Sequence, residues 1–144
     1  FYATRLYREL REKTGLVYTV NDSLSASQTR ASYSVSYGCD PKNVSKARAI
    51  VQRQLADMRK YNVSPTELQQ AKALLLRQIP LSESSEDAVA GGFMGRAVIG
   101  LPLDEPEHAA KRYFGMTADQ VRAAFAQWVD PNNFVQVVRG PAPH

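Results

Sequence analysis

The feature that most constrains the fold of this chain is its order of hydrophobic patterns: strand-like patterns come first, and helical spacing follows. Between Thr29 and Gly38 apolar residues alternate with polar ones, and this period of two predicts a strand with one buried face. The run Leu16–Ala26 before it is also strand-like, whereas helical spacing of apolar residues dominates most of the later sequence. Adjacent strands followed by a run of helices predict an α+β fold, with an antiparallel sheet covered by helices on one side.

A helix is predicted over residues 2–14, before the first strand. Leu6 and Leu10 share one face of it, and charged residues cover the other. Gly15 is well placed to end this helix, because glycine takes the left-handed conformation at no steric cost. We expect the two strands beyond it to form an antiparallel hairpin through the linking residues Ser25 to Gln28.

Capping residues mark the starts of the later helices. Asp40 before Pro41 and Asp104 are predicted N-caps, and Ser64–Glu67 and Thr117–Gln120 both match the capping-box pattern. Helical spacing predicts three inward-facing stripes: Val44, Ala47, Val51, Leu55 and Met58 in one helix; Leu68, Ala71, Leu75 and Ile79 in the next; and Val121, Ala124, Phe125 and Trp128 in the last.

The end of the sequence predicts a third strand. Asp130 to Asn133 is a predicted turn, and Phe134 to Val138 is the predicted closing strand. Three strands are few for so much helix, so we expect further strands upstream or on a partner. The sequence opens without a methionine or a leader, which suggests a domain truncated at its N-terminus. No repeat or linker divides residues 1–144, which predicts a single domain.

The composition argues against several classes of function. Hydrophobic residues make up 44% and charged residues 22% of the chain, as in ordinary soluble domains. The net charge of +4 is scattered, without lysine clusters or stacking aromatics, so nucleic-acid binding ranks only third among the alternatives. The most apolar stretch, Ala88–Leu103, contains Arg96 and is shorter than the ~20 residues of a membrane span. We therefore predict no nucleic-acid partner and no membrane span.

No catalytic zinc site is predicted in this chain. Zinc hydrolysis needs two or three histidine or carboxylate ligands at defined spacing. His108 and His144 are the only histidines, and neither His-x-x-Glu-His nor its inverse occurs. We expect His108 to be a solvated helix residue. Cys39, the only cysteine, has no histidine nearby in sequence and is expected to be a small buried residue.

Arg11 and Tyr18 remain as candidates for chemistry. Taken alone, Arg11 suits the dipole of a helix C-terminus and Tyr18 suits a packed strand, and these structural roles are favoured. The chemistry of the two side chains also allows a role in binding and cleaving a peptide. An arginine holds a peptide carbonyl or carboxylate with a planar fork of donors, and a tyrosine hydroxyl donates to an oxyanion on a scissile carbonyl. On either side of a tight corner, the two side chains can converge on one peptide.

Four segments, in order along the chain, resemble the C-terminal, zinc-free domain of M16-family (insulinase- and pitrilysin-like) zinc peptidases. They are Arg5–Tyr18, Ser64–Lys72, Gly100–Leu103 and Asp130–Val138. The resemblance implies an α+β domain of the M16 (LuxS/MPP-like) metallohydrolase type. It also implies a clamshell pairing with a second domain, which carries a His-x-x-Glu-His zinc site.

The resemblance also implies a role for each candidate residue. The family's arginine and tyrosine, which contact the substrate peptide near the scissile bond, fall on Arg11 and Tyr18. The chain would then bind peptide substrate and help to stabilise the transition state, while a zinc-bearing domain or subunit supplies the metal. Alone it would be inactive. The alternative is an inactive homologue that serves as a scaffold or assembly subunit, in a homo- or heterodimer. Export to the periplasm of a bacterium is the expectation taken from the family.

Overall fold

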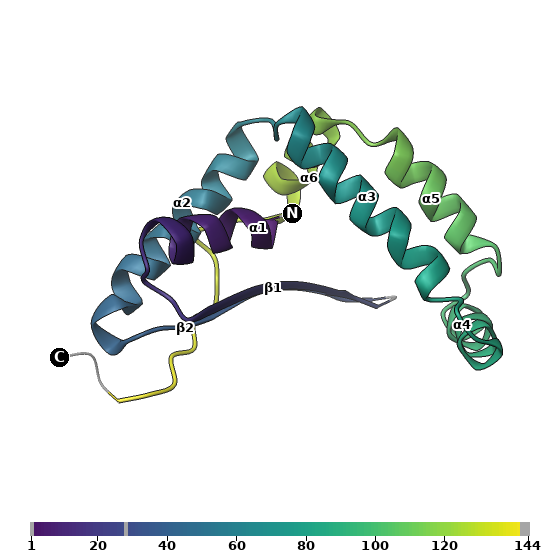
Figure 1. Ribbon diagram of the computed structural model, residues 1–144, viewed down its shortest axis with the longest axis horizontal. Coiled ribbons are helices and arrows are strands. Elements are labelled where there is room, and N and C mark those ends of the chain that lie inside the picture. Colours follow the sequence, from purple (N-terminus) through teal and green to yellow (C-terminus); the bar gives the residue numbers. More distant parts are fainter. Residues whose placement is uncertain (1, 28, 142–144) are drawn as a thin grey trace.

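The computed structural model describes residues 2–27 and 29–141. Its elements, in chain order, are α1 (Tyr2–Tyr7), the π-helix η1 (Arg8–Lys13), β1 (Thr19–Ala26), β2 (Ala31–Gly38), the 3-10 helix η2 (Pro41–Asn43), α2 (Val44–Lys60), α3 (Pro65–Leu81), α4 (Glu86–Val98), α5 (Glu105–Gly115) and α6 (Ala118–Trp128). The helices lie on one side of a two-stranded antiparallel sheet (Figure 1). The prediction of an α+β fold is confirmed.

The two strands form the expected hairpin. Thr19 pairs with Gly38 at its base, and Ala26 pairs with Ala31 at its tip. The connection therefore spans residues 27–30, two residues later than predicted, because Ser25 and Ala26 still belong to the ladder. Gln28 lies outside the described residues. The Ser27 N–H donates to the carbonyl of Arg30 at 2.8 Å and closes the turn.

One hydrophobic core lies between α1, η1, the base of the hairpin and α2. Its buried members are Leu6, Leu10, Val17, Val20, Ala47, Val51, Leu55, Met58 and Val63. The predicted stripe of α2 is confirmed, with Val44 half-buried at its start. Tyr33, Val35 and Tyr37 of β2 pack against this core, and the serines between them are exposed, as the alternation predicted.

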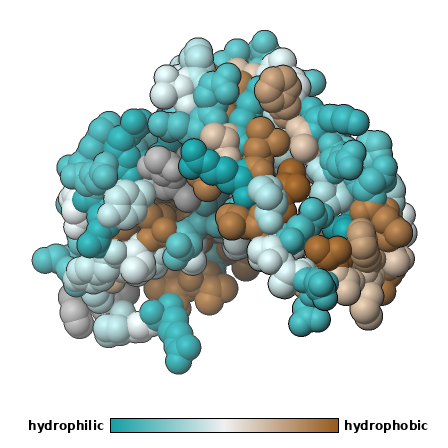
Figure 2. Space-filling model, turned by 45° about the vertical axis from the view of Figure 1, so that its right-hand side comes forward, coloured by the Kyte–Doolittle hydropathy of each residue, from teal (hydrophilic) through white to brown (hydrophobic). Residues whose placement is uncertain are grey.

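The helices α3, α4 and α5 extend away from this core. No residue of the three is fully buried. The predicted inward stripe of α3 is confirmed only in part, because Leu68 packs against the core and Ala71 and Ile79 are half-buried, whereas Leu75 is 39% exposed. The main packing partner of α3 is α5 and not the sheet. α3 lies beside α5 (Figure 1), where the Lys72 ammonium donates to the carbonyl of Phe114 at 2.8 Å. Figure 2 shows apolar residues, in brown, on the surface at the right-hand side, where these helices lie.

The helix starts confirm part of the predicted capping. Ser64 and Glu67 form a complete capping box, and Thr117 and Gln120 form a second one. Asp40 and Asp104 occupy the predicted N-cap positions, but neither side chain makes a capping hydrogen bond to its helix start. Each carboxylate instead faces a more distant side chain.

The predicted closing strand, Phe134–Val138, is not present as a strand. The turn before it forms as expected, with the Asn132 N–H donating to Asp130 Oδ1 at 3.0 Å. Beyond this turn no described residue supplies a ladder partner, and a β-strand exists only when paired. Val135 and Val137 are 93% and 86% exposed. The sheet of the described chain therefore has two strands, not three.

Candidate functional site

The corner between η1 and β1 depends on Gly15, whose φ of 61° lies in the left-handed region. The Gly15 N–H donates to the carbonyl of Arg11 at 3.1 Å, and the Leu16 N–H donates to the carbonyl of Leu10 at 2.9 Å. These two bonds each span one residue more than in a Schellman motif, because the last helical turn is a π-turn. The predicted glycine stop is confirmed.

Burial and backbone bonds fix both sides of this corner. Leu10 is fully buried and Val17 is 2% exposed, so each arm is anchored in the core. Beyond Val17, the Tyr18 N–H donates to the carbonyl of Gly38 at 2.7 Å. Since Thr19 is also paired with Gly38, two residues oppose one, which is the arrangement of a β-bulge. Bulges redirect side chains, and the Tyr18 side chain is 61% exposed.

Arg11 reaches across the corner to the backbone of the strand. Its Nη1 donates to the carbonyl of Val17 at 3.3 Å and also to the carbonyl of Tyr18. Its Nε and Nη2 groups make no hydrogen bond to any residue that the structure describes. The two predicted site residues are thus in contact, through the Arg11 guanidinium and the Tyr18 backbone.

The Tyr18 hydroxyl has a partner that the sequence did not suggest. It donates to Asp40 Oδ1 at 2.6 Å. This hydrogen bond and the charge of Asp40 raise the pKa of Tyr18 above its ordinary value. The pairing of the hairpin explains this contact. Thr19 pairs with Gly38, so Tyr18, just before Thr19, lies close to Asp40, two positions after Gly38.

The charges on η1 are partly neutralised by one another. Glu9 accepts a hydrogen bond from the Lys13 ammonium at 2.6 Å and lies 3.6 Å from the Arg53 guanidinium. The hydrogen bond from Lys13 lowers the pKa of Glu9 below its ordinary value. Arg11 makes no ion pair with Glu9. Its guanidinium lies against the backbone of Val17 and Tyr18.

Other polar residues form no competing site in the described chain. Within residues 2–27 and 29–141, no three histidine, cysteine, aspartate or glutamate side chains are placed to hold a metal ion. His108 is a half-exposed helix residue 3.2 Å from Asp104 Oδ2, and His144 lies outside the described residues. Cys39 is half-buried, and its burial, with a smaller contribution from the charge of Asp40, raises the pKa of the thiol. A raised pKa lowers the fraction of thiolate, which is the reactive form of cysteine.

None of the helices in the described part of the chain is long and apolar enough to cross a bilayer.

Comparison with solved structures supports the same fold. The crystal structure of a peptidase M16 inactive domain from Pseudomonas fluorescens superimposes with a TM-score of 0.76 at 26% identity, over 88% of this chain and 30% of that chain. The periplasmic protease PqqL from Escherichia coli superimposes with a TM-score of 0.70 at 19% identity, over 89% of this chain and 14% of that one. This chain therefore spans less than a third of either similar structure.

Comparison of the sequence gives the family. None of the curated proteins matches the chain. The family model described as the peptidase M16 inactive domain matches residues 2–75, which is just over half of the 144 residues and includes Arg11, Gly15, Tyr18 and Asp40. The chain belongs to the peptidase M16 inactive-domain family.

Proposed function

We propose that this chain is the zinc-free half of an M16 zinc endopeptidase, which binds the substrate peptide while a zinc-bearing domain or subunit activates water. The observation that carries the proposal is the contact between Arg11 and Tyr18 at one exposed corner. A periplasmic location is proposed with it, by analogy with the periplasmic protease PqqL.

Tyr18 would act as the hydrogen-bond donor to the developing oxyanion. A donor must keep its proton, and the Tyr18 hydroxyl is already a donor in its hydrogen bond to Asp40. The hydroxyl is exposed and held in one direction by Asp40 at 2.6 Å. When the scissile carbonyl gains negative charge, its oxygen would replace the Asp40 carboxylate as the acceptor of this hydrogen bond.

Arg11 would hold the backbone of the substrate. Its Nη1 is engaged with two carbonyls of its own chain, which fixes the plane of the guanidinium. The Nε and Nη2 groups then present their hydrogens from a fixed position to a further carbonyl or carboxylate. Positioning of this kind lowers the entropic cost of bringing the substrate to the zinc-bound water.

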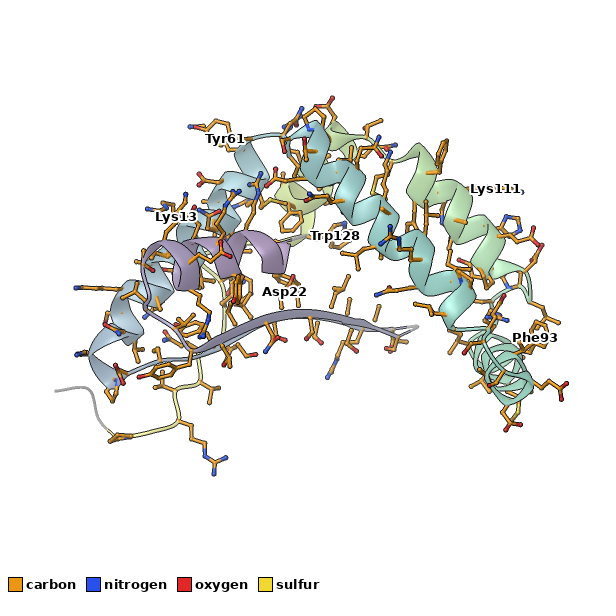
Figure 3. All side chains as sticks on the ribbon, in the orientation of Figure 1. Lys13, Asp22, Tyr61, Phe93, Lys111 and Trp128 are labelled. Atoms are coloured by element: carbon orange, nitrogen blue, oxygen red, sulfur yellow. The ribbon has the colours of Figure 1, made fainter. Side chains whose placement is uncertain are left out.

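The test is to combine this chain with a zinc-bearing M16 half and to measure peptide cleavage. Arg11→Ala is compared with Arg8→Ala, an exposed arginine on the same helix, and Tyr18→Phe is compared with Tyr61→Phe. Tyr61 follows the C-terminal end of α2, away from the corner. Lys13, the last residue of η1, marks the position of the corner in Figure 3. We expect both site variants to lose activity and both controls to keep it. Parental activity in both site variants would refute the proposed roles.

A specific observation favours a second candidate, a scaffold or assembly subunit without a catalytic role. Both polar groups of the pair already have partners within the chain, Arg11 at the backbone of β1 and Tyr18 at Asp40. On this alternative, Arg11→Ala and Tyr18→Phe would lower the stability of the corner and leave cleavage by the assembly unchanged. Measuring unfolding and cleavage on the same four variants separates the two candidates.

A further inference from the structure

The Asp40 carboxylate lies beside the Tyr18 hydroxyl without a cation of its own. Its Oδ1 accepts the hydrogen bond from this hydroxyl at 2.6 Å, and Asp40 is half-buried. None of the ion pairs among the described residues includes Asp40. Its side chain also makes no hydrogen bond to the start of η2. The negative charge of Asp40 is therefore not neutralised by any side chain that the structure describes.

The basic residues closest in sequence to this corner are engaged elsewhere or stay apart from Asp40. Arg11 directs its Nη1 at the carbonyls of Val17 and Tyr18. The Lys13 ammonium donates to Glu9 at 2.6 Å. Lys42, two residues after Asp40, is exposed and forms no ion pair with it. Any cation that pairs with Asp40 during catalysis therefore has to arrive with another molecule.

An unneutralised charge on Asp40 opposes the proposed chemistry. In that chemistry the Tyr18 hydroxyl turns from Asp40 to the oxygen of the scissile carbonyl, which becomes negative. Because each of these oxygens lies within hydrogen-bond distance of the same hydroxyl, the two negative charges are at most about 6 Å apart. They repel each other, and the repulsion grows when the bound peptide excludes water. A cation beside Asp40 removes this penalty from the transition state.

We propose that Asp40 makes the assembled peptidase selective for peptides that carry a lysine or arginine side chain beside the scissile bond. This cation pairs with the Asp40 carboxylate as Tyr18 turns to the oxyanion. Since Asp40 is one hydroxyl away from the reacting oxygen, the basic residue lies within about two positions of the scissile bond in an extended peptide. The inference rests on the proposed function and adds the class of substrate to it. Asp40 is in this account a specificity-determining residue.

Matched peptides test the selectivity in the assembly with the zinc-bearing half. One peptide carries a single lysine near the scissile bond, the other carries Nε-acetyllysine at the same position, and both have an acetylated N-terminus. Mass spectrometry of the products identifies the bond that is cleaved. We expect kcat/KM to be about tenfold higher for the lysine peptide, because charges pair more strongly away from water than at a surface. Equal cleavage would overturn the inference, as would a preference that follows a free N-terminus instead of the lysine side chain.

The variant Asp40→Asn tests the residue itself. The amide oxygen still accepts a hydrogen bond from Tyr18, so the substitution removes the charge and keeps an acceptor. We expect slower cleavage of the lysine peptide and faster cleavage of the acetyllysine peptide than in the parent, so that the tenfold preference disappears. Because the neutral peptide must gain rate, loss of folding cannot imitate this result.

Glu12→Gln is the matched control. Glu12 is an exposed acid on η1, next to Arg11 in sequence, and makes no hydrogen bond to Tyr18 among the described residues. The control should keep the parental preference for lysine. An unchanged preference in Asp40→Asn, or the same loss of preference in Glu12→Gln, would overturn the assignment to Asp40.

Tyr18→Phe and Arg11→Ala, measured with the same peptides, separate this inference from the proposed function. If both variants lose rate and the parent shows no preference for lysine, the proposed function stands and the inference alone fails. If both variants keep the parental rate, the proposed function fails, and the inference fails with it. Loss of rate in both variants, together with a lysine preference that Asp40→Asn abolishes, is the result that we expect.

Discussion

The Tyr18 hydroxyl donates a 2.6 Å hydrogen bond to Asp40 Oδ1, which joins the start of β1 to the residue pair that follows β2. The bond crosses the base of the hairpin and connects residues 22 positions apart. It fixes the direction of the phenol hydroxyl, and it uses the carboxylate that the sequence assigned to a helix cap. The candidate site is therefore a corner of three residues, Arg11, Tyr18 and Asp40.

Removal of Asp40 should lower the pKa of Tyr18 toward its ordinary value of 10.0. Asp40→Ala removes both the hydrogen bond and the charge, whereas Asp40→Asn removes the charge alone and should have the smaller effect. The pKa is measured by NMR titration of the tyrosine ring. Asp87→Ala, an exposed acid in the first turn of α4, is the control. A Tyr18 pKa that stays at the parental value in Asp40→Ala would contradict the hydrogen bond.

The Arg5–Glu67 ion pair should make stability depend on pH in acid. The Arg5 guanidinium meets both Glu67 carboxylate oxygens, at 2.7 and 2.8 Å, and so ties α1 to the start of α3. The hydrogen bond from Arg5, with further bonds from Ser64, lowers the pKa of Glu67 from 4.5 to about 2. Because the folded pKa is the lower one, the stabilisation is complete above about pH 5 and is lost as the pH falls toward 2.

Chemical denaturation of Glu67→Gln checks this expectation. Between about pH 7 and about pH 3, the parent should lose about 2 kcal/mol more of its unfolding free energy than Glu67→Gln does. At neutral pH the variant should be about 1.5–3 kcal/mol less stable, as for a hydrogen bond to a charged group. Glu83→Gln, whose side chain is exposed in the loop after α3, serves as the matched control. The same acid dependence in parent and Glu67→Gln would contradict the assignment.

Two glycine substitutions should change stability in opposite directions. Gly15 has φ 61° and no atom within 4 Å of an added Cβ, so Gly15→Ala carries only the backbone cost of a left-handed alanine, about 1–2 kcal/mol. Gly91 lies inside α4 with the same open space, so Gly91→Ala should gain about 0.5–1 kcal/mol. Thermal unfolding of the two variants measures both. A neutral Gly15→Ala would show that the corner does not need the left-handed conformation.

The core beneath the corner should be far less tolerant of truncation than the tip of the hairpin. Leu10 is fully buried between η1 and α2, and Leu10→Ala should destabilise the chain by about 2–5 kcal/mol. Leu24 is 73% exposed near the tip of β1, and Leu24→Ala should change stability by less than about 0.5 kcal/mol. The denaturant midpoints of the two variants measure these changes in stability. Similar losses of stability in Leu10→Ala and Leu24→Ala would contradict the placement of the core beneath the corner.

Local signals in the sequence were sufficient for the parts of the fold that depend on neighbouring residues. The capping boxes at Ser64 and Thr117, the glycine stop at Gly15 and the alternation in β2 each arise from contacts within a few positions. The corner that brings Arg11 to Tyr18 is of the same kind, since seven residues separate the two. For this reason the predicted pair of residues is found in contact.

The remaining features depend on partners that no short window contains. Asp40 is an acceptor for Tyr18 because the hairpin brings the two together, and a capping pattern cannot reveal that competition. Phe134–Val138 has a strand-like sequence but no partner backbone among the described residues, so its pattern alone does not make a strand. Two members of the predicted stripes stay exposed for the same reason, Leu75 of α3 at 39% and Trp128 of α6 at 78% (Figure 3).

The turnover number of Tyr18→Phe, measured with the zinc-bearing half in place, tests the central claim most directly. If the Tyr18 hydroxyl stabilises the oxyanion, kcat should fall by about 10²–10³-fold while KM changes little, because the interaction is made in the transition state. Tyr61→Phe should retain the parental kcat. A parental kcat in Tyr18→Phe, with zinc bound and the assembly intact, would contradict the claim and leave this chain as a scaffold.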